Sequence, residues 1–189
     1  MNYRHIYHAG NFADVHKHLI FVLTLDYLQQ KEKGLLVLDA FAGIGLYDLT
    51  RPEPQKTNEF REGIAKVMAS AAHNPDLTRF QSVIQPFWDK TCYAGSPLLA
   101  AHLARPQDRV IANELHPEDV ETLQESLANY ASVRITQEDA YQSIRANNTV
   151  LPNHCTVENH CINANQAIVS NGTAMQRGFM THRDIAPNH

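Results

Sequence analysis

The sequence has little cysteine, no long hydrophobic run and no excess of basic residues. Its three cysteines, Cys92, Cys155 and Cys161, form neither a close pair nor a zinc motif, which argues against a secreted disulfide framework and favours a cytoplasmic protein. No segment approaches the roughly 18 successive apolar residues of a membrane span, so we expect no membrane association. The chain carries 16 basic and 20 acidic residues, so any nucleic-acid site must be a local feature.

An apolar run from Leu35 to Leu38 ends in Asp39 and a small-residue loop that contains Gly43 and Gly45. Four successive apolar residues favour a buried parallel strand, and two glycines one residue apart let the backbone turn tightly beside a ligand. The pattern is typical of dinucleotide-binding folds, of folds that bind S-adenosylmethionine (SAM), and of ordinary tight turns. The loop therefore indicates a cofactor site only in combination with its neighbours.

Helical and strand patterns alternate along the chain, which implies an α/β fold with a parallel sheet and right-handed crossovers. Gly34, Pro117 and other local signals set the expected boundaries. The expected strands are 35–39, 109–113 and 133–135. The expected helices are 14–33 with Asp14 as its cap, 58–72, 96–104 with Ser96 as its cap, 117–130 and a short one at 141–145.

Four regions are expected from these patterns. They are an N-terminal motif and helix (1–34), a Rossmann-like SAM-binding domain in two pieces (35–47 and 93–146), an inserted helical segment (48–92) and an atypical tail (147–189). The tail has no leucine after Leu151 and no traceable helical or strand period. A disordered extension and a frame-shifted end both remain open for it.

Carboxylates follow the second and third expected strands. In open parallel sheets ligands bind outside the carboxyl ends of the strands, where Gly43, Glu114 and Asp139 should converge. A carboxylate in the place of Glu114 commonly accepts hydrogen bonds from ribose hydroxyls, and one in the place of Asp139 could accept from an adenine amino group. Alternatively, Glu114 only caps the next helix and Asp139 is a solvated turn residue.

The segment from residue 3 to residue 18 combines aromatic rings, imidazoles and the cations Arg4 and Lys17 with a small-residue turn. Aromatic and arginine side chains stack on flipped-out bases, and cations bind phosphate, so the segment predicts a nucleic-acid-binding surface. His16 and His18 diverge on a helix, so we expect no metal site. Capping and core packing are the alternative.

Several short motifs occur in order along residues 1–145. They are Tyr-Arg-His at 3–5, His-Ala-Gly-Asn-Phe-Ala-Asp-Val at 8–15, Lys-His at 17–18, Leu-Asp-x-x-Ala-Gly-x-Gly at 38–45, Thr-Asn-Glu-Phe at 57–60 with Glu-Gly-Ile at 62–64, Tyr-Ala-Gly-Ser-Pro at 93–97 and Glu-Leu-His-Pro at 114–117. Together they resemble the bacterial 23S rRNA adenine-N6-methyltransferase family of the J type. The resemblance implies a monomeric, Rossmann-like enzyme that uses SAM to methylate one adenine of naked or early-assembly 23S rRNA.

The resemblance also implies site residues. Tyr3 would lie where the family contacts its RNA, in the same motif as Arg4 and His5. Phe41 stands in place of a histidine and Ala140 in place of a glycine, so backbone contacts are expected there. The residues that would surround SAM are Lys17, His18, Phe41, Gly43, Ser96, Glu114, Asp139 and Ala140.

One motif of the family is missing, because the sequence contains no Pro-Pro pair. The lone pair of adenine N6 is delocalised into the ring. Amino-methylating enzymes therefore place Asp/Asn-Pro-Pro-aromatic after the fourth strand, where the acid and a proline carbonyl accept hydrogen bonds from the amino group. In this family the motif is Asp-Pro-Pro-Tyr. We therefore expect an incomplete sheet whose first strand has an unpaired edge, and a SAM pocket without its catalytic acid.

Three functions remain for the chain. The first is the SAM-dependent rRNA methyltransferase implied by the resemblance, and the second is a non-catalytic SAM- or RNA-binding remnant, which the missing acid favours. A nicotinamide-dependent oxidoreductase is the third. It is disfavoured because Asp48 stands where the last glycine of Gly-x-Gly-x-x-Gly would be.

Overall fold

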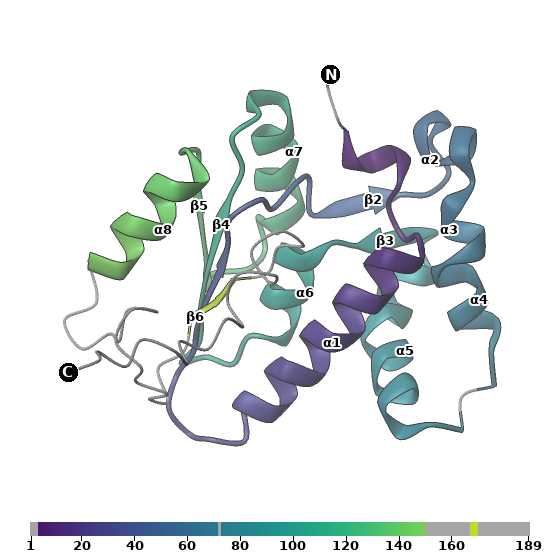
Figure 1. Cartoon of the computed structure of the whole chain (residues 1–189), viewed down its shortest axis with the longest axis horizontal. Coiled ribbons are helices and arrows are strands. Elements are labelled where there is room, and N and C mark those ends of the chain that lie inside the picture. The colour runs from purple at the N-terminus through teal and green to yellow at the C-terminus, as the bar shows by residue number, and fades with distance from the viewer. Residues whose placement is uncertain (1–3, 72, 150–166, 170–189) are drawn as a thin grey trace, which may run out of the picture.

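The computed structural model describes residues 4–71, 73–149 and 167–169 (Figure 1). The strands are β1 (Leu36–Asp39), β2 (Leu46–Asp48), β3 (Cys92–Ala94), β4 (Arg109–Asn113), β5 (Val133–Thr136) and β6 (Ala167–Val169). The helices are η1 (His5–Tyr7, a 3₁₀ turn), α1 (Phe12–Leu28), α2 (Pro52–Thr57), α3 (Glu59–Glu62), α4 (Ile64–Ala69), α5 (Pro75–Trp88), α6 (Ser96–Leu103), α7 (Pro117–Leu127) and α8 (Ala140–Thr149).

The main sheet has the strand order β5-β4-β1-β6, and all of its pairings are parallel. Leu36 lies opposite Arg109 in β4 and opposite Ala167 in β6. The apolar residues of β1 and β4 other than Leu36 are buried, as expected for strands covered on both faces. The predicted α/β fold with a parallel sheet is confirmed.

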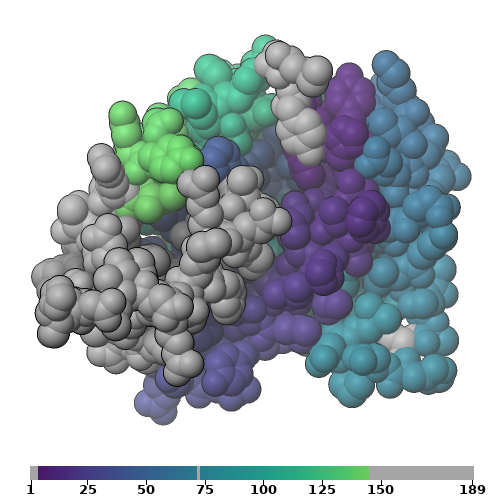
Figure 2. All heavy atoms as spheres, in the orientation of Figure 1, coloured from purple at the N-terminus to yellow at the C-terminus, as the bar shows by residue number. Residues whose placement is uncertain are grey.

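Helices cover both faces of this sheet. Figure 1 shows α1 and α6 on one side and α8 on the other. Helix α1 contacts α6 and α5, and its Phe21, Val22 and Leu25 belong to the buried core. In the space-filling view α1, in purple, lies side by side with the blue helices that follow β2 (Figure 2). The amino-terminal segment is therefore packed against both the sheet layer and these helices.

A second, small sheet pairs β2 with β3 in antiparallel orientation, with Leu46 opposite Ala94. Helices α2 to α5 lie between these two strands in sequence. The Gly95 N–H donates to the Gly45 carbonyl at 2.7 Å, so the start of α6 is held beside the loop that follows β1. Neither β2, β3 nor α5 was expected from the sequence.

Two predicted helix caps are wrong. Helix α1 is capped by Asn11, whose side chain accepts from the Asp14 N–H at 3.0 Å, and it ends at Leu28 rather than near residue 33. Asp14 lies inside the first turn because its carboxylate is drawn into buried contacts described below. Helix α6 is capped by Gly95, and Ser96 is its first helical residue.

The helix expected over 58–72 is divided at Gly63 into α3 and α4. A Cβ atom on Gly63 would lie 2.2 Å from the Gly10 carbonyl oxygen, so only glycine allows this close approach of two backbones. The strand 109–113 has its expected ends, and the remaining expected helices and strands differ from the structure by a few residues at their ends.

The predicted unpaired edge of β1 is also wrong, because β6 pairs with it in parallel over Leu36 to Leu38. Any extended segment can satisfy the backbone groups of a strand, and Ala-Ile-Val at 167–169 does so here. The rest of the tail beyond residue 149 lies outside the described residues.

Candidate functional site

Asp39, at the carboxyl end of β1, is fully buried and organises the loop that follows it. Its carboxylate accepts from the Phe41 N–H at 3.3 Å and from the Ser96 hydroxyl at 2.6 Å. The Ser96 hydroxyl therefore links β1 to the first turn of α6 instead of capping that helix.

Glu114 follows β4 and lies against the same loop. One carboxylate oxygen accepts from the Gly43 N–H at 2.8 Å, and the other accepts from the His116 N–H at 3.0 Å. A carboxylate oxygen has two lone pairs, so each keeps the capacity for another donor. The prediction that Glu114 and the glycine loop converge is confirmed by this contact, and the interpretation of Glu114 as only a helix cap is too narrow.

Asn113, the last residue of β4, joins three strand ends through four hydrogen bonds. Its side-chain amide donates to the carbonyls of Ala40 at 3.1 Å and Glu138 at 3.0 Å. Its side-chain oxygen accepts from the Thr136 hydroxyl at 2.9 Å and from the Glu138 N–H at 3.0 Å. This buried amide therefore sets the positions of the segments after β1 and β5 relative to each other.

Asp139 is exposed and caps α8, because one of its carboxylate oxygens accepts from the N–H groups of Tyr141 at 3.0 Å and Gln142 at 3.3 Å. Ala140 is buried at the start of that helix. Asp139 follows directly after Glu138, which Asn113 holds. It is thus placed at the same sheet edge as Glu114, with part of its acceptor capacity already used.

The glycine loop has the conformation that its sequence requires. Gly43 and Gly45 have φ angles of +63° and +77°, a region that other residues rarely adopt. A Cβ atom on Gly43 would also lie 2.5 Å from the Tyr47 hydroxyl oxygen. The Phe41 side chain is 60% exposed, so it does not form part of the core.

The amino-terminal segment forms a second cluster around Asp14, whose side chain is buried. Its carboxylate accepts from His5 Nε2 at 2.8 Å and the Gly10 N–H at 3.0 Å, and it pairs with Lys17 Nζ at 3.0 Å. Burial alone would raise the pKa of Asp14, but the His5 hydrogen bond and the nearby cations outweigh it and hold this pKa well below its usual range.

His18 is buried one turn further along α1. Its Nδ1 atom lies 2.7 Å from the Tyr93 hydroxyl, and the two rings stack with centroids 5.5 Å apart. Burial lowers the pKa of His18 to about 4, so the imidazole is neutral at pH 7. The two predicted cofactor residues on α1 therefore differ: Lys17 carries a positive charge, whereas the His18 ring is neutral and buried.

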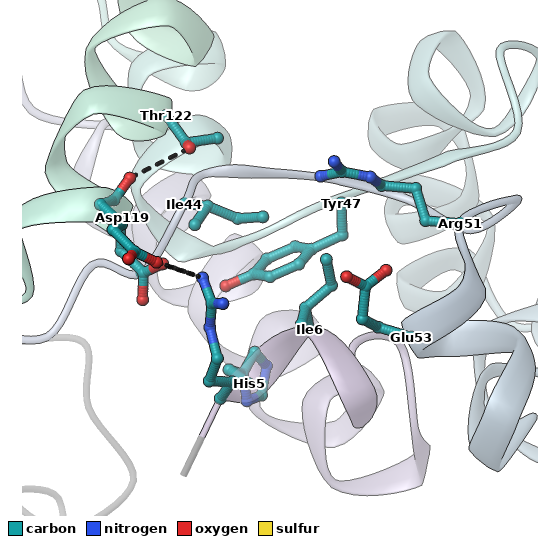
Figure 3. Close-up of a pocket in the computed structure, with 11 residues that line it drawn as sticks. His5, Ile6, Ile44, Tyr47, Arg51, Glu53, Asp119 and Thr122 are labelled. Carbon is teal, nitrogen blue, oxygen red and sulfur yellow. Dashed lines mark hydrogen bonds and ion pairs between the residues drawn. The ribbon is translucent and has the colours of Figure 1, made fainter. Parts of the chain in front are cut away.

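A cavity of about 230 Å³ lies beside the glycine loop, between η1, β2, α2 and the start of α7 (Figure 3). Arg4 reaches across its rim to Asp119 at 3.1 Å and Glu118 at 3.5 Å. The ring of His5 meets the Tyr47 ring edge-on, with centroids 5.5 Å apart. Arg4 and His5, predicted to face RNA, therefore both line this cavity, while Tyr3 lies outside the described residues.

The structure thus arranges the predicted residues in two neighbouring groups. Phe41, Gly43, Ser96 and Glu114 are tied together at the carboxyl edge of the main sheet, and Lys17 and His18 belong to the Asp14 cluster. Sequence reasoning missed Asp39, Asn113 and Asp14 as organisers of these groups. The polar residues that end β1 and β4 were the available signal for the first two.

Two further observations concern the described part of the chain. Within it, His, Cys, Asp and Glu side chains form no group of three that could hold a metal ion. No helix in residues 4–71 and 73–149 is long and apolar enough to cross a membrane.

Comparison with known proteins places this arrangement in a family. The sequence model of the family described as "RsmJ: Ribosomal RNA large subunit methyltransferase D, RlmJ" matches residues 32–155, about two thirds of the chain. The ribosomal RNA large subunit methyltransferase J of Haemophilus influenzae is 37% identical over 150 residues, which is 77% of this chain and 53% of the relative. The enzyme of the same name from Escherichia coli is 36% identical over 149 residues, with the same coverage.

A solved structure agrees with these matches. The crystal structure of protein LPL1258 from Legionella pneumophila superposes with a TM-score of 0.65 at 33% identity, covering 76% of this chain and 53% of that one. The chain spans about half the length of the curated relatives it matches. By the match of the family model, by its relatives and by its fold, the chain belongs to the RlmJ family of large-subunit ribosomal RNA methyltransferases.

Proposed function

We propose that the chain binds SAM and 23S rRNA in the manner of an adenine-N6-methyltransferase, with a site that lacks the catalytic Asp-Pro-Pro-Tyr motif. Its membership of the RlmJ family supports the reaction class. The observation that carries the cofactor assignment is the link between Gly43 and Glu114, which brings the glycine loop and a ribose-type acceptor into direct contact.

The residues present fit a SAM molecule. SAM carries a sulfonium-activated methyl group together with a ribose, an adenine and an amino-acid end. Glu114 keeps acceptor capacity for ribose hydroxyls, and Asp139 at the same edge has an oxygen for the adenine amino group. A Cβ atom at Gly43 would clash with the Tyr47 hydroxyl, so glycine at this position lets the loop pack closely on Tyr47.

Lys17 and Ser96 complete the proposed cofactor contacts. Lys17 is held by Asp14 and offers a positive charge for the carboxylate of the amino-acid end. Ser96 is held by Asp39. At Phe41 and Ala140 we propose that backbone groups contact the cofactor, since the Phe41 ring is exposed and Ala140 has no polar side-chain atom.

The catalytic step requires an acceptor for the adenine amino group beside the methyl donor. Strand β6 pairs with β1, and in the sequence it is followed by Ser170-Asn171-Gly172, not by Asp-Pro-Pro-Tyr. We therefore propose that cofactor and RNA binding are encoded and that transfer is not. The chain would then be a non-catalytic SAM- and RNA-binding protein. The second candidate function, an active rRNA methyltransferase, is supported by the family membership alone.

Calorimetric titration of the purified full chain with S-adenosylhomocysteine tests the cofactor site, after circular dichroism has shown that the chain is folded. We expect saturable binding, weakened about 10-fold in Glu114→Gln and unchanged in Glu121→Gln, an exposed acid of α7. A folded chain that does not bind would overturn the cofactor assignment. Binding of NADH instead would favour an oxidoreductase.

Methyl transfer is measured separately with labelled SAM and protein-free 23S rRNA. We expect no transfer above the level without protein. Incorporation of label at adenine N6 by this chain would contradict the proposal that the site lacks its catalytic group, and would restore the full enzymatic assignment.

A further inference from the structure

The cavity beside the glycine loop contains an acceptor without a donor. Oε2 of Glu53, at the start of α2, is buried and has no hydrogen-bond partner in the described part of the chain. Leaving a buried carboxylate oxygen unsatisfied is costly, and such atoms usually meet a donor from a ligand or from ordered water. Figure 3 shows the Glu53 carboxylate directed toward Tyr47.

The walls around Glu53 suit a flat ring. Tyr47 and Ile6 are buried, and together with Ile44 they give the cavity an apolar side. With about 230 Å³ of space it is smaller than the roughly 300–1,000 Å³ typical of sites for drug-sized ligands. It can therefore hold a fragment of the size of one nucleobase, but not a whole cofactor.

One cation of the cavity favours a ligand that has an anionic part. Arg4 is engaged by both Glu118 and Asp119, so it is not available to a ligand. Arg51 lines the cavity, forms no ion pair within 4 Å in the described residues, and points toward Tyr47 in Figure 3. A metal ion or a polyamine would satisfy Glu53 but would leave Arg51 without an anionic partner. A nucleotide satisfies both, with its base on Glu53 and its phosphate near a guanidinium.

We propose that this cavity is a subsite for one unpaired RNA nucleotide whose base carries an exocyclic amino group, with Glu53 accepting a hydrogen bond from that group. The inference rests on the proposed function, because it takes the ligand to be RNA. Adenine, cytosine and guanine have such an amino group. Uracil offers only a ring N–H between two carbonyl oxygens, which a carboxylate repels.

The proposed subsite is separate from most of the proposed SAM contacts. Gly43 is the single residue that the cavity shares with them. The other walls of the cavity come from the loop after β1 and from η1, β2, α2 and α7. A base held there lies beside the proposed cofactor site, so the subsite would contribute to sequence selection in the bound RNA.

Fluorescence anisotropy with the full chain tests this subsite, using labelled oligo(A), oligo(C) and oligo(U) of equal length. We expect oligo(A) and oligo(C) to bind at least about 10-fold more tightly than oligo(U), the effect of one hydrogen bond to a charged acceptor. Glu53→Met keeps the size of the side chain, removes both acceptor oxygens and should abolish this preference. Glu121→Met removes the same charge from an exposed position of α7 and should preserve it.

Equal binding of the three oligomers, no binding at all, or a preference that survives in Glu53→Met would overturn the inference. If Glu53→Met does not fold, Glu53→Gln provides the test. Its amide can donate to a uracil carbonyl, so it should narrow the gap between oligo(A) and oligo(U), and an unchanged gap would contradict the role of Glu53.

Titration with S-adenosylhomocysteine separates this inference from the proposed function. If the chain binds S-adenosylhomocysteine but shows no base preference, only the proposal of a nucleotide subsite is contradicted. If a folded chain shows a base preference that depends on Glu53 but does not bind S-adenosylhomocysteine, the result supports the subsite and contradicts the proposed SAM site.

Discussion

The two ends of the main sheet are both held by buried polar side chains, but in opposite ways. At the amino end, Asp108 accepts from the Leu35 N–H at 2.8 Å and from Gln29 Nε2 at 3.0 Å, and it pairs with Arg105 at 2.9 Å. At the carboxyl end, Asp39 accepts from the Phe41 N–H and the Ser96 hydroxyl, and Glu114 accepts from the N–H groups of Gly43 and His116.

The partners decide what each carboxylate is still able to do. Burial would raise the pKa of Asp108, but the Arg105 hydrogen bond and the backbone donors lower it to about 2. Arg105 also donates to the carbonyls of Gln29 and Lys31, each at 2.7 Å, so this end is a closed network. Within the described residues Glu114 pairs with no cation, so it keeps acceptor capacity for a ligand. The amino end is thus a closed network, whereas Glu114 at the carboxyl end keeps unused acceptor capacity.

Removing Asp108 should give the largest effect. Asp108→Ala leaves Arg105 and the Leu35 N–H without their acceptor, and we expect a loss of about 3–5 kcal/mol in the free energy of unfolding. Urea denaturation measures it. Asp26→Ala is the matched control, because it breaks the partly exposed ion pair with Arg79 and should cost at most about 1 kcal/mol. Equal effects of the two variants would mean that the Arg105 network is not a special anchor.

Asn113→Ala removes the central side chain of the carboxyl end. The Ala40 and Glu138 groups lose their partners, and we expect a loss of about 2–3 kcal/mol in the free energy of unfolding. S-adenosylhomocysteine should also bind more weakly, measured at a temperature where the variant is folded. In Asp108→Ala, under the same condition, its affinity should be unchanged. If both variants bind the cofactor like the parent chain, the Asn113 junction does not position the site.

Acid should lower the free energy of unfolding through His18 of α1. Its pKa falls from about 6.5 in the unfolded chain to about 4 in the folded chain, so the unfolded state takes up a proton first. The contribution of His18 to the free energy of unfolding is therefore complete above pH 6.5 and is lost as the pH falls toward 4. Between pH 7 and pH 5 the loss should be about 2 kcal/mol. Urea denaturation at the two pH values checks this.

The matched histidine controls for that measurement lie on the same helix. His18→Gln should flatten the pH dependence between pH 7 and pH 5, whereas His16→Gln, at an exposed position of α1, should leave it in place. An identical slope in both variants would show that some other group controls the acid response.

Ser96→Ala should give the smallest effect. The variant loses the hydroxyl that donates to Asp39, but Asp39 still accepts from the Phe41 N–H. We therefore expect the free energy of unfolding to fall by about 1 kcal/mol. Thermal denaturation detects this. Thr122→Ala removes a hydroxyl that bonds to its own helix at 3.2 Å and should change the melting temperature less. A larger effect of Thr122→Ala would contradict the role given to Ser96.

Local signals in the sequence predicted the main sheet well. The strand 109–113 was predicted with its observed ends, because its apolar residues are buried on both faces. Asp14 was misassigned as a cap because its burial depends on His5 and Gly10, whose positions the local pattern does not show. The pairing of β2 with β3 depends on residues far apart in sequence, and so does the link between Asp39 and Ser96. Glu114 and the glycine loop were predicted to meet because parallel strands end at one edge, which is a property of the fold.

The junction at Asn113 limits how this protein can be modified. Loops at the edge of an α/β sheet are often treated as modules that can be exchanged one at a time. Here the connection after β1 and the turn after β5 both depend on the same amide of β4. A loop grafted from a relative into either place has to present a carbonyl where Ala40 or Glu138 now does. The two connections and the end of β4 are therefore inherited, or redesigned, as one unit.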